Sequence, residues 1–116
     1  MRRPEATIQR AVFAHLRKRA MPNVFAWHTP NGGRRERIEG AIFKGLGVVA
    51  GVPDVVCIKD GLTYGLELKS ERGAVSANQE AVLNAMHKAG AFVSITFGLD
   101  EALRQLEDWG ILRGKA

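Results

Sequence analysis

The sequence lacks the features that would place it among disulfide-bonded, zinc-binding or membrane proteins. Its single cysteine, Cys57, excludes an internal disulfide, and no cluster of Cys and His has zinc-finger spacing. No stretch approaches the roughly 18 apolar residues of a membrane helix. The positive amino terminus is not followed by the apolar segment of a signal peptide, because Glu5 and Arg10 interrupt it. We therefore expect a cytoplasmic protein without a membrane span.

Internal repeats and low-complexity segments are also missing. The 116 residues, with 46% hydrophobic and 25% charged side chains, are typical of a single globular domain that spans residues 1–116. The 17 Lys and Arg outnumber the 12 Asp and Glu, which gives a net charge of +5 and a pI near 9.9. This excess favours a polyanionic partner such as nucleic acid, although many basic proteins bind none.

The first half of the chain predicts one helix and one strand. Residues 4–20 predict a helix, because Pro4 suits a helix start and apolar residues recur every fourth position. Residues 24–28 resemble a strand and run into the turn-forming cluster TPNGG at 29–33. Residues 34–50 begin basic, become small and apolar, and carry no clear prediction of secondary structure.

The second half predicts a hairpin followed by a helix, a strand and a final helix. Two apolar runs, at 54–59 and 62–69, flank Asp60-Gly61, which is a strong signal for a two-residue hairpin turn. The other predicted elements are a helix capped by Ser76 and closed by Gly90, a strand at 91–97, and a helix capped by Asp100 and closed by Gly110. The full order is helix, three strands, helix, strand, helix, which indicates an α/β fold with a mixed sheet flanked by helices. We expect the last strand to pair in parallel, because a helix precedes it.

Three charged residues fall at the open end of the predicted hairpin. Residues equally far from the turn face each other, so Asp54 faces Glu67 with about 5 Å between their Cβ atoms. Lys69 lies two residues beyond Glu67 and therefore shares its face of the sheet. Two facing carboxylates repel, so either Lys69 or a divalent cation such as Mg²⁺ or Mn²⁺ should compensate them. The alternative is a salt-bridged polar strand end without a ligand.

These residues also carry a family resemblance. The motifs GVPD at 51–54, ELK at 67–69 and S-x-x-Q at 76–79, followed by a strand after Gly90, resemble the PD-(D/E)xK nucleases. Within that superfamily they resemble the virus-type replication-repair nuclease (VRR-NUC) domain, over nearly the whole chain. The resemblance implies a restriction-endonuclease-like core and hydrolysis of phosphodiester bonds with Mg²⁺ or Mn²⁺. It further implies that Asp54 and Glu67 bind the metal with the Leu68 carbonyl, and that Lys69 is the catalytic lysine.

Two further assignments compete with simpler explanations. Gln79 matches a glutamine that lies near the site in this family, although helix capping by itself explains a Gln at this position. Glu5 is a candidate metal ligand from the first helix, because the family often supplies another acid there. The helix dipole alone also favours an acid in a first turn.

The segment HTPNGGRRER at 28–37 places small residues beside three arginines. Exposed backbone N–H groups and guanidinium groups bind phosphate oxygens, so we expect contacts to the DNA backbone here. The alternative is a solvated charged loop, which Glu36 and Glu39 favour. His28 is a DNA contact, a partner of the site or, more simply, a strand-end residue with a local hydrogen bond. The candidate DNA-binding residues are Asn31, Gly32, Gly33, Arg34, Arg35, Arg37, Lys44 and Arg72.

The most specific function implied by the resemblance is a structure-selective DNA endonuclease. Stand-alone VRR-NUC proteins resemble Holliday-junction resolvases, which implies branched DNA as substrate, a homodimer with two sites, and a phage or prophage setting. Two alternatives stay open. One is a nuclease of the same fold that acts on flaps, nicks or other duplex DNA, and the other is a DNA-binding module that has lost catalysis. The presence of all three catalytic-type residues favours an enzyme.

Overall fold

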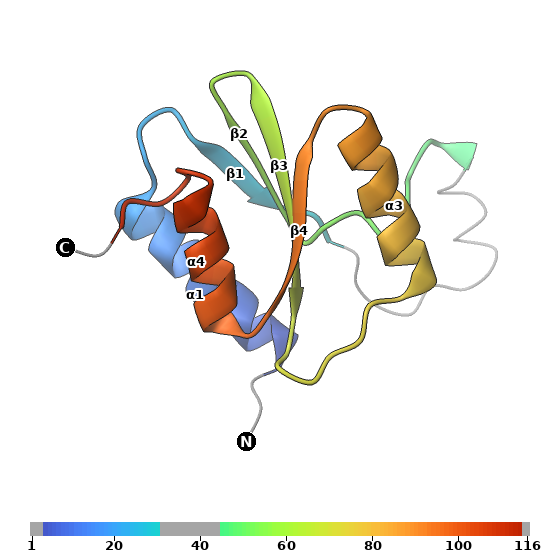
Figure 1. Cartoon of the computed structure of the whole chain (residues 1–116), viewed down its shortest axis with the longest axis horizontal. Helices are drawn as coiled ribbons and strands as arrows, with labels where there is room; N and C mark the ends of the chain where they lie inside the picture. Colours follow the sequence, from blue (N-terminus) through green and yellow to red (C-terminus); the bar gives the residue numbers. More distant parts are fainter. Residues whose placement is uncertain (1–3, 31–44, 115–116) are drawn as a thin grey trace.

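The structure is a computed structural model that describes residues 4–30 and 45–114 (Figure 1). The elements of these residues are α1 (Glu5–Arg19), β1 (Phe25–His28), β2 (Val55–Lys59), β3 (Leu62–Lys69), α3 (Ala77–Lys88), β4 (Phe92–Phe97) and α4 (Leu99–Asp108). The strands form one sheet in the order β1-β2-β3-β4, antiparallel at the first two junctions and parallel at the third. The predicted α/β fold, element order and parallel last pairing are confirmed. No helix in the described part of the chain is long and apolar enough to cross a membrane.

The β2–β3 hairpin turns at Asp60-Gly61, as predicted. Both residues have positive φ, 54° and 79°, which a two-residue type I′ turn requires. Val55 pairs with Leu66 across the ladder, which is the register predicted from the turn. Because side chains alternate between the two faces of a strand, this register places Glu67 and Lys69 on the face opposite the buried leucines of β3.

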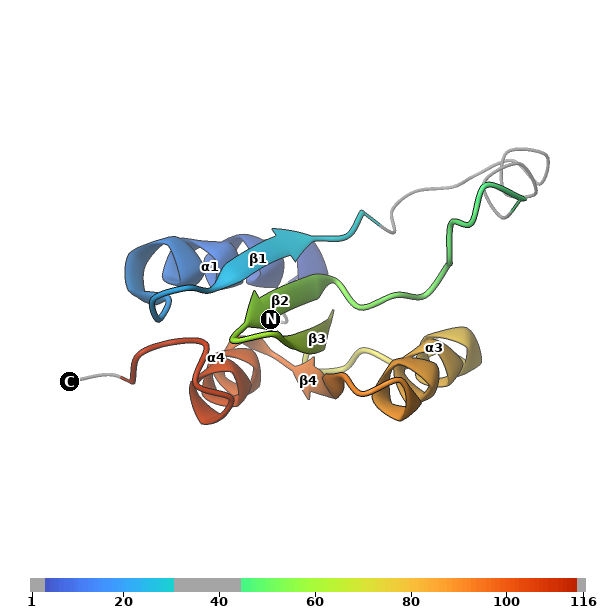
Figure 2. The ribbon, with the colours of Figure 1, turned by 90° about the horizontal axis from the view of Figure 1, so that it is seen from above.

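The helices cover the two faces of the sheet unequally. Figure 2 shows α1 and α4 on one side of the sheet and α3 on the other. The main core lies on the α1–α4 side, where burial of each large apolar side chain contributes about 1.5–3 kcal/mol. Its members are Ile8, Val12, Leu16, Val55, Cys57, Tyr64, Leu66, Leu68, Ala102, Leu103, Leu106, Ile111 and Leu112. The Trp109 ring packs against Tyr64 at 5.3 Å between centroids, so Trp109 belongs to this core.

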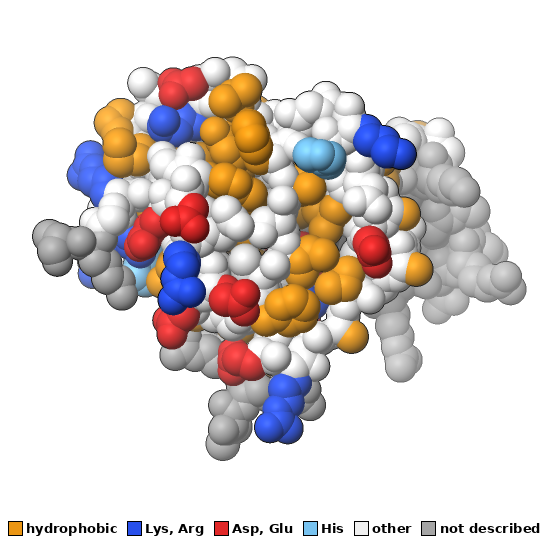
Figure 3. Space-filling model, viewed as in Figure 1, with side chains coloured by type: hydrophobic (Ala, Val, Ile, Leu, Met, Phe, Trp, Pro, Cys, Tyr) orange, Lys and Arg blue, Asp and Glu red, His pale blue; other side chains and the backbone are white. Residues whose placement is uncertain are grey.

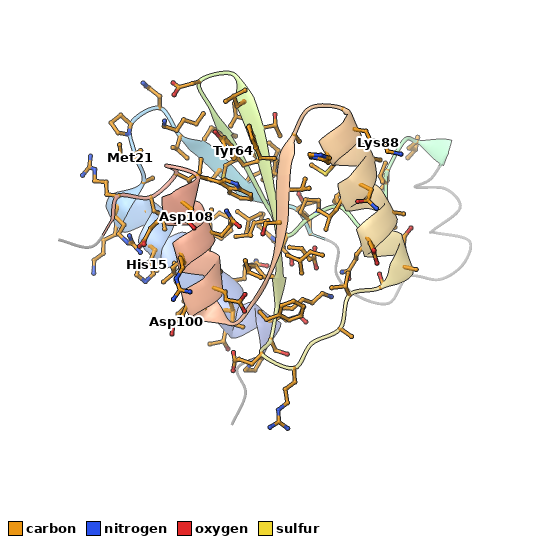
Figure 4. The ribbon with its side chains drawn as sticks, viewed as in Figure 1. His15, Met21, Tyr64, Lys88, Asp100 and Asp108 are labelled. Carbon is orange, nitrogen blue, oxygen red and sulfur yellow. The ribbon has the colours of Figure 1, made fainter. Side chains whose placement is uncertain are left out.

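The start of α4 differs from the prediction. Gly98 occupies the cap position with φ 87°, so Asp100 lies inside the first turn and does not cap the helix (Figure 4). The Gly98 N–H donates to the Lys69 carbonyl at 2.8 Å, which attaches the start of the helix to the end of β3. Glycine suits this position because side chains disfavour such a positive φ. Asp100 still interacts favourably with the helix dipole from the first turn.

Candidate active site

Asp54 and Glu67 meet at the open end of the β2–β3 hairpin. Asp54 immediately precedes β2, and its Oδ2 accepts a hydrogen bond from the Leu68 N–H of β3 at 3.0 Å. Leu68 directly follows Glu67 in the chain, so this bond holds the Asp54 side chain beside the Glu67 carboxyl. The structure therefore brings together the two acids that the register predicts to face each other.

Glu67 is a buried carboxyl with a strongly raised pKa. The residue is 1% exposed, and its Oε1 has no hydrogen-bond partner among the described residues. Burial, followed by the charge of Asp54, raises the pKa of Glu67 to about 8, and the charge of Lys69 opposes this rise. A buried acid with an unpartnered oxygen beside a second acid indicates a place that takes up a proton or a cation.

Lys69 lies on the same face of β3 and is also buried. Its Nζ is 3.7 Å from Glu67 Oε2, and the residue is 7% exposed. The ammonium group of Lys69 lies beside Glu67, and the pKa of Glu67 stays raised despite it. Lys69 alone therefore compensates the acid pair only in part, and a proton or a cation completes the neutralisation.

Gln79 serves the helix and the acid pair at once. Its backbone N–H donates to Ser76 Oγ at 3.0 Å, and its Oε1 accepts from the Ser76 N–H at 3.1 Å, which completes the predicted capping box. The other end of the amide remains available, and Nε2 donates to Glu67 Oε2 at 2.9 Å. The two explanations that the sequence left open are compatible, because each uses different atoms of Gln79.

The remaining predicted residues lie at the margin of this site or outside the described part. Glu5 is exposed in the first turn of α1, and its charge makes the smallest contribution to the raised pKa of Glu67. Within residues 4–30 and 45–114, no three His, Cys, Asp or Glu side chains gather as metal ligands, so Glu5 as a ligand stays a prediction. Arg72 is exposed in the turn after β3. The predicted residues outside the description are Asn31, Gly32, Gly33, Arg34, Arg35, Arg37 and Lys44.

Contacts of three residues position Asp54; the sequence did not predict the packing of Pro53, whereas it left a local hydrogen bond of His28 open. Pro53 is buried against Gly65 of β3, where an added Cβ would lie 2.7 Å from the proline Cγ. The Asp54 carbonyl accepts hydrogen bonds from the Thr29 N–H and from His28 Nδ1, both at 2.9 Å. A glycine inside a strand often marks a close approach, so Gly65 was the one available signal in the sequence for the first contact.

The acid pair fits a divalent cation. Mg²⁺ and Mn²⁺ take oxygen ligands, commonly one or two protein carboxylates, while water and substrate phosphate complete the shell. The adjacent carboxylates of Asp54 and Glu67 match that donor set, as does Glu67 Oε1, which has no hydrogen-bond partner within residues 4–30 and 45–114. With the pKa of Glu67 near 8, a cation that binds at neutral pH would displace a proton from the pair.

The fold of the described residues is shared with a solved structure. A solved structure described as "VRR_NUC domain protein" superimposes with a TM-score of 0.73 over 90% of this chain and 86% of its own, at 20% identity. The likeness confirms the VRR-NUC fold that the motifs imply. No family model and no curated protein sequence matches the chain. At this identity the likeness establishes only the shared fold. The activity has to be inferred from the chemistry of the site.

Proposed function

We propose that this protein is a divalent-metal-dependent DNA endonuclease that hydrolyses phosphodiester bonds. The observation that carries the proposal is the buried Glu67 carboxyl beside Asp54, with Lys69 Nζ at 3.7 Å and Gln79 Nε2 at 2.9 Å from its Oε2. Burying an acid with an unpartnered oxygen is costly for folding, so a purely structural strand end does not account for it.

Each residue of the site would have a different role in the reaction. Asp54 and Glu67, with the Leu68 carbonyl, would hold Mg²⁺ or Mn²⁺, which when bound polarises the phosphate and lowers the pKa of water. Lys69 places a positive charge beside the acids, from which it can donate to the attacking water or to the charge that develops on the phosphate. Gln79 orients the Glu67 carboxyl through its hydrogen bond. These groups would thus act together at the face of β3 that carries Glu67 and Lys69.

The distribution of charge favours one approach for DNA. Helix α4 carries Asp100, Glu101, Glu107 and Asp108, and acidic side chains gather over it in Figure 3. Glu67 and Lys69 lie on the other face of the sheet, the one that α3 covers (Figure 2). A phosphate backbone repelled by α4 would therefore reach the site from the α3 side. The proposed phosphate contacts are Arg72, exposed in the turn after β3, and the arginines of the basic segment at 28–37.

The finer proposal is a homodimer that acts on four-way junctions in DNA recombination or repair, in the cytoplasm. The similarity of stand-alone VRR-NUC proteins to Holliday-junction resolvases supports the substrate by analogy. Strand β1, at the edge of the sheet that the described residues form, supports self-association, because Phe25 and Trp27 are 68% and 37% exposed on it with ring centroids 5.6 Å apart. Exposed aromatic side chains on a sheet edge are typical of a pairing surface.

Cleavage assays on a panel of four-way, flap, nicked and linear DNA test the proposal. With Mg²⁺ or Mn²⁺, paired symmetric nicks on the four-way junction would support the resolvase, whereas cleavage confined to flaps, nicks or linear DNA would support another nuclease of this fold. Lys69→Ala run in parallel should be inactive, which excludes a contaminating nuclease. Binding without cleavage of any substrate would support a DNA-binding module and overturn the enzyme.

A further inference from the structure

The Asp54 carbonyl is held by two donors from the end of β1. The ladder between β1 and β2 ends with the pair His28 and Val55, and the Thr29 N–H extends it by one bond to the Asp54 oxygen at 2.9 Å. His28 Nδ1 lies 2.9 Å from the same oxygen and adds a bond that does not belong to the ladder. A carbonyl only accepts hydrogen bonds, so the His28 Nδ1 must carry the hydrogen. A side chain of the edge strand thus contacts the backbone of one of the paired acids.

His28 is one of three contacts that hold Asp54 in place. The Asp54 carboxylate is held by the Leu68 N–H at 3.0 Å, and the preceding Pro53 is buried against Gly65. The His28 ring bonds the same carbonyl as the Thr29 N–H, and so further limits rotation of the peptide plane that follows Asp54, the residue whose side chain is paired with Glu67. Groups that orient metal ligands in this indirect way commonly affect metal affinity by about 10-fold to 100-fold.

We propose that His28 is a positioning residue that fixes the Asp54 carboxylate for metal binding through its Nδ1–H bond to the Asp54 carbonyl. The inference rests on the proposed nuclease function, since it assigns His28 to the same site. It differs from a direct DNA contact, which would act on substrate binding alone. It also differs from a purely structural strand-end bond, which would act on stability alone.

Three substitutions of His28 distinguish these roles, because they differ in whether and where they place a hydrogen-bond donor. Asn carries its amide nitrogen at the position of Nδ1, Gln carries it about one bond further out, and Ala has none. We expect His28→Asn to bind Mn²⁺ nearly as tightly as wild type, and His28→Ala and His28→Gln to bind it about tenfold more weakly. The control is His87→Ala, which removes an exposed histidine from the last turn of α3.

Calorimetric titration with Mn²⁺ at one fixed pH is the primary measurement, accompanied by melting temperatures and by kcat and KM for DNA cleavage. The proposal expects a lower Mn²⁺ affinity and kcat for His28→Ala, an unchanged KM for DNA, and recovery in His28→Asn. Unchanged Mn²⁺ affinity in His28→Ala, or equal weakening in the Asn and Gln variants, would overturn it. If His28→Ala does not fold, the comparison of Asn with Gln decides. If the wild-type protein binds no Mn²⁺, the proposed function is overturned as well. If the wild-type protein binds Mn²⁺ and cleaves DNA, the proposed function stands, and a negative result for the variants overturns only the role of His28.

Discussion

Gln79 donates from Nε2 to Glu67 Oε2 at 2.9 Å while its Oε1 accepts from the Ser76 N–H at 3.1 Å. One amide thereby joins the first turn of α3 to the buried acid of the candidate active site. The same side chain therefore takes part in the helix cap and holds the Glu67 carboxyl, through different atoms.

Ser76→Ala and Gln79→Ala should separate capping from the support of Glu67. Loss of the Ser76 hydroxyl removes one capping bond and should lower the free energy of unfolding by about 1 kcal/mol. Cleavage should stay close to the wild-type rate, because Gln79 Nε2 still reaches Glu67. Gln79→Ala should lose comparable stability and also cleave at least about tenfold more slowly. Urea denaturation and single-turnover cleavage measure the two effects, and equal cleavage rates in the two variants would contradict a separate role of Gln79 in supporting Glu67.

The raised pKa of Glu67 predicts that the metal-free protein loses stability as the pH rises. An unfolded glutamate releases its proton near 4.5, whereas the folded carboxyl keeps it up to about 8. Between these values the folded state binds more protons than the unfolded state, so the free energy of unfolding falls with increasing pH. Melting temperatures in EDTA across this window should show the decline.

Glu67→Gln provides the matched control for this pH dependence. The amide has nearly the size of the carboxyl and does not titrate, so the variant should lack the Glu67 contribution to the slope. It should melt above wild type on the alkaline side of pH 8, where the wild-type carboxyl is ionised in a buried site. Wild-type and variant profiles that run parallel across the window would show that Glu67 has an ordinary pKa.

Gly65→Ala should disturb Asp54 through Pro53. The added Cβ would lie 2.7 Å from Pro53 Cγ and 3.2 Å from Met86 Cε, so the proline must move. Overpacking of this kind costs about 1–3 kcal/mol, and the shift of Pro53 should also weaken Mn²⁺ binding. Calorimetry and thermal denaturation test both effects. Gly114→Ala is the control, because no atom of the described residues lies within 4 Å of its added Cβ, and an equal response of the two variants would exclude the Pro53 contact as the cause.

Lys69→Ala should reduce kcat by about 100-fold or more while DNA binding and folding persist. Asp54→Asn and Glu67→Gln should abolish cleavage in the same way. The matched control is Lys59→Ala, because Lys59 forms a surface ion pair with Asp60 at 3.1 Å that contributes little to stability. Steady-state cleavage and gel-shift titration measure the two properties. Undiminished cleavage by purified Asp54→Asn would refute the assignment of the site.

Local signals were sufficient for most of the fold. The Asp60-Gly61 turn determines which residues of β2 and β3 face each other, and apolar spacing placed α1, because both patterns depend on neighbours in the chain. The start of α4 was predicted wrongly at Asp100, because the cap depends on the bond from Gly98 to the distant Lys69 carbonyl.

The sequence by itself determined the acid pair, since a hairpin register follows from its turn and brings Asp54 opposite Glu67. Only the tertiary structure decided how that pair is held. The bond from Gln79 to Glu67, the bond from His28 to Asp54 and the packing of Pro53 on Gly65 join residues whose separation along the chain has no periodic signature. The burial that raises the pKa of Glu67 arises in the same way, from packing of segments that meet only when the sheet and α3 assemble.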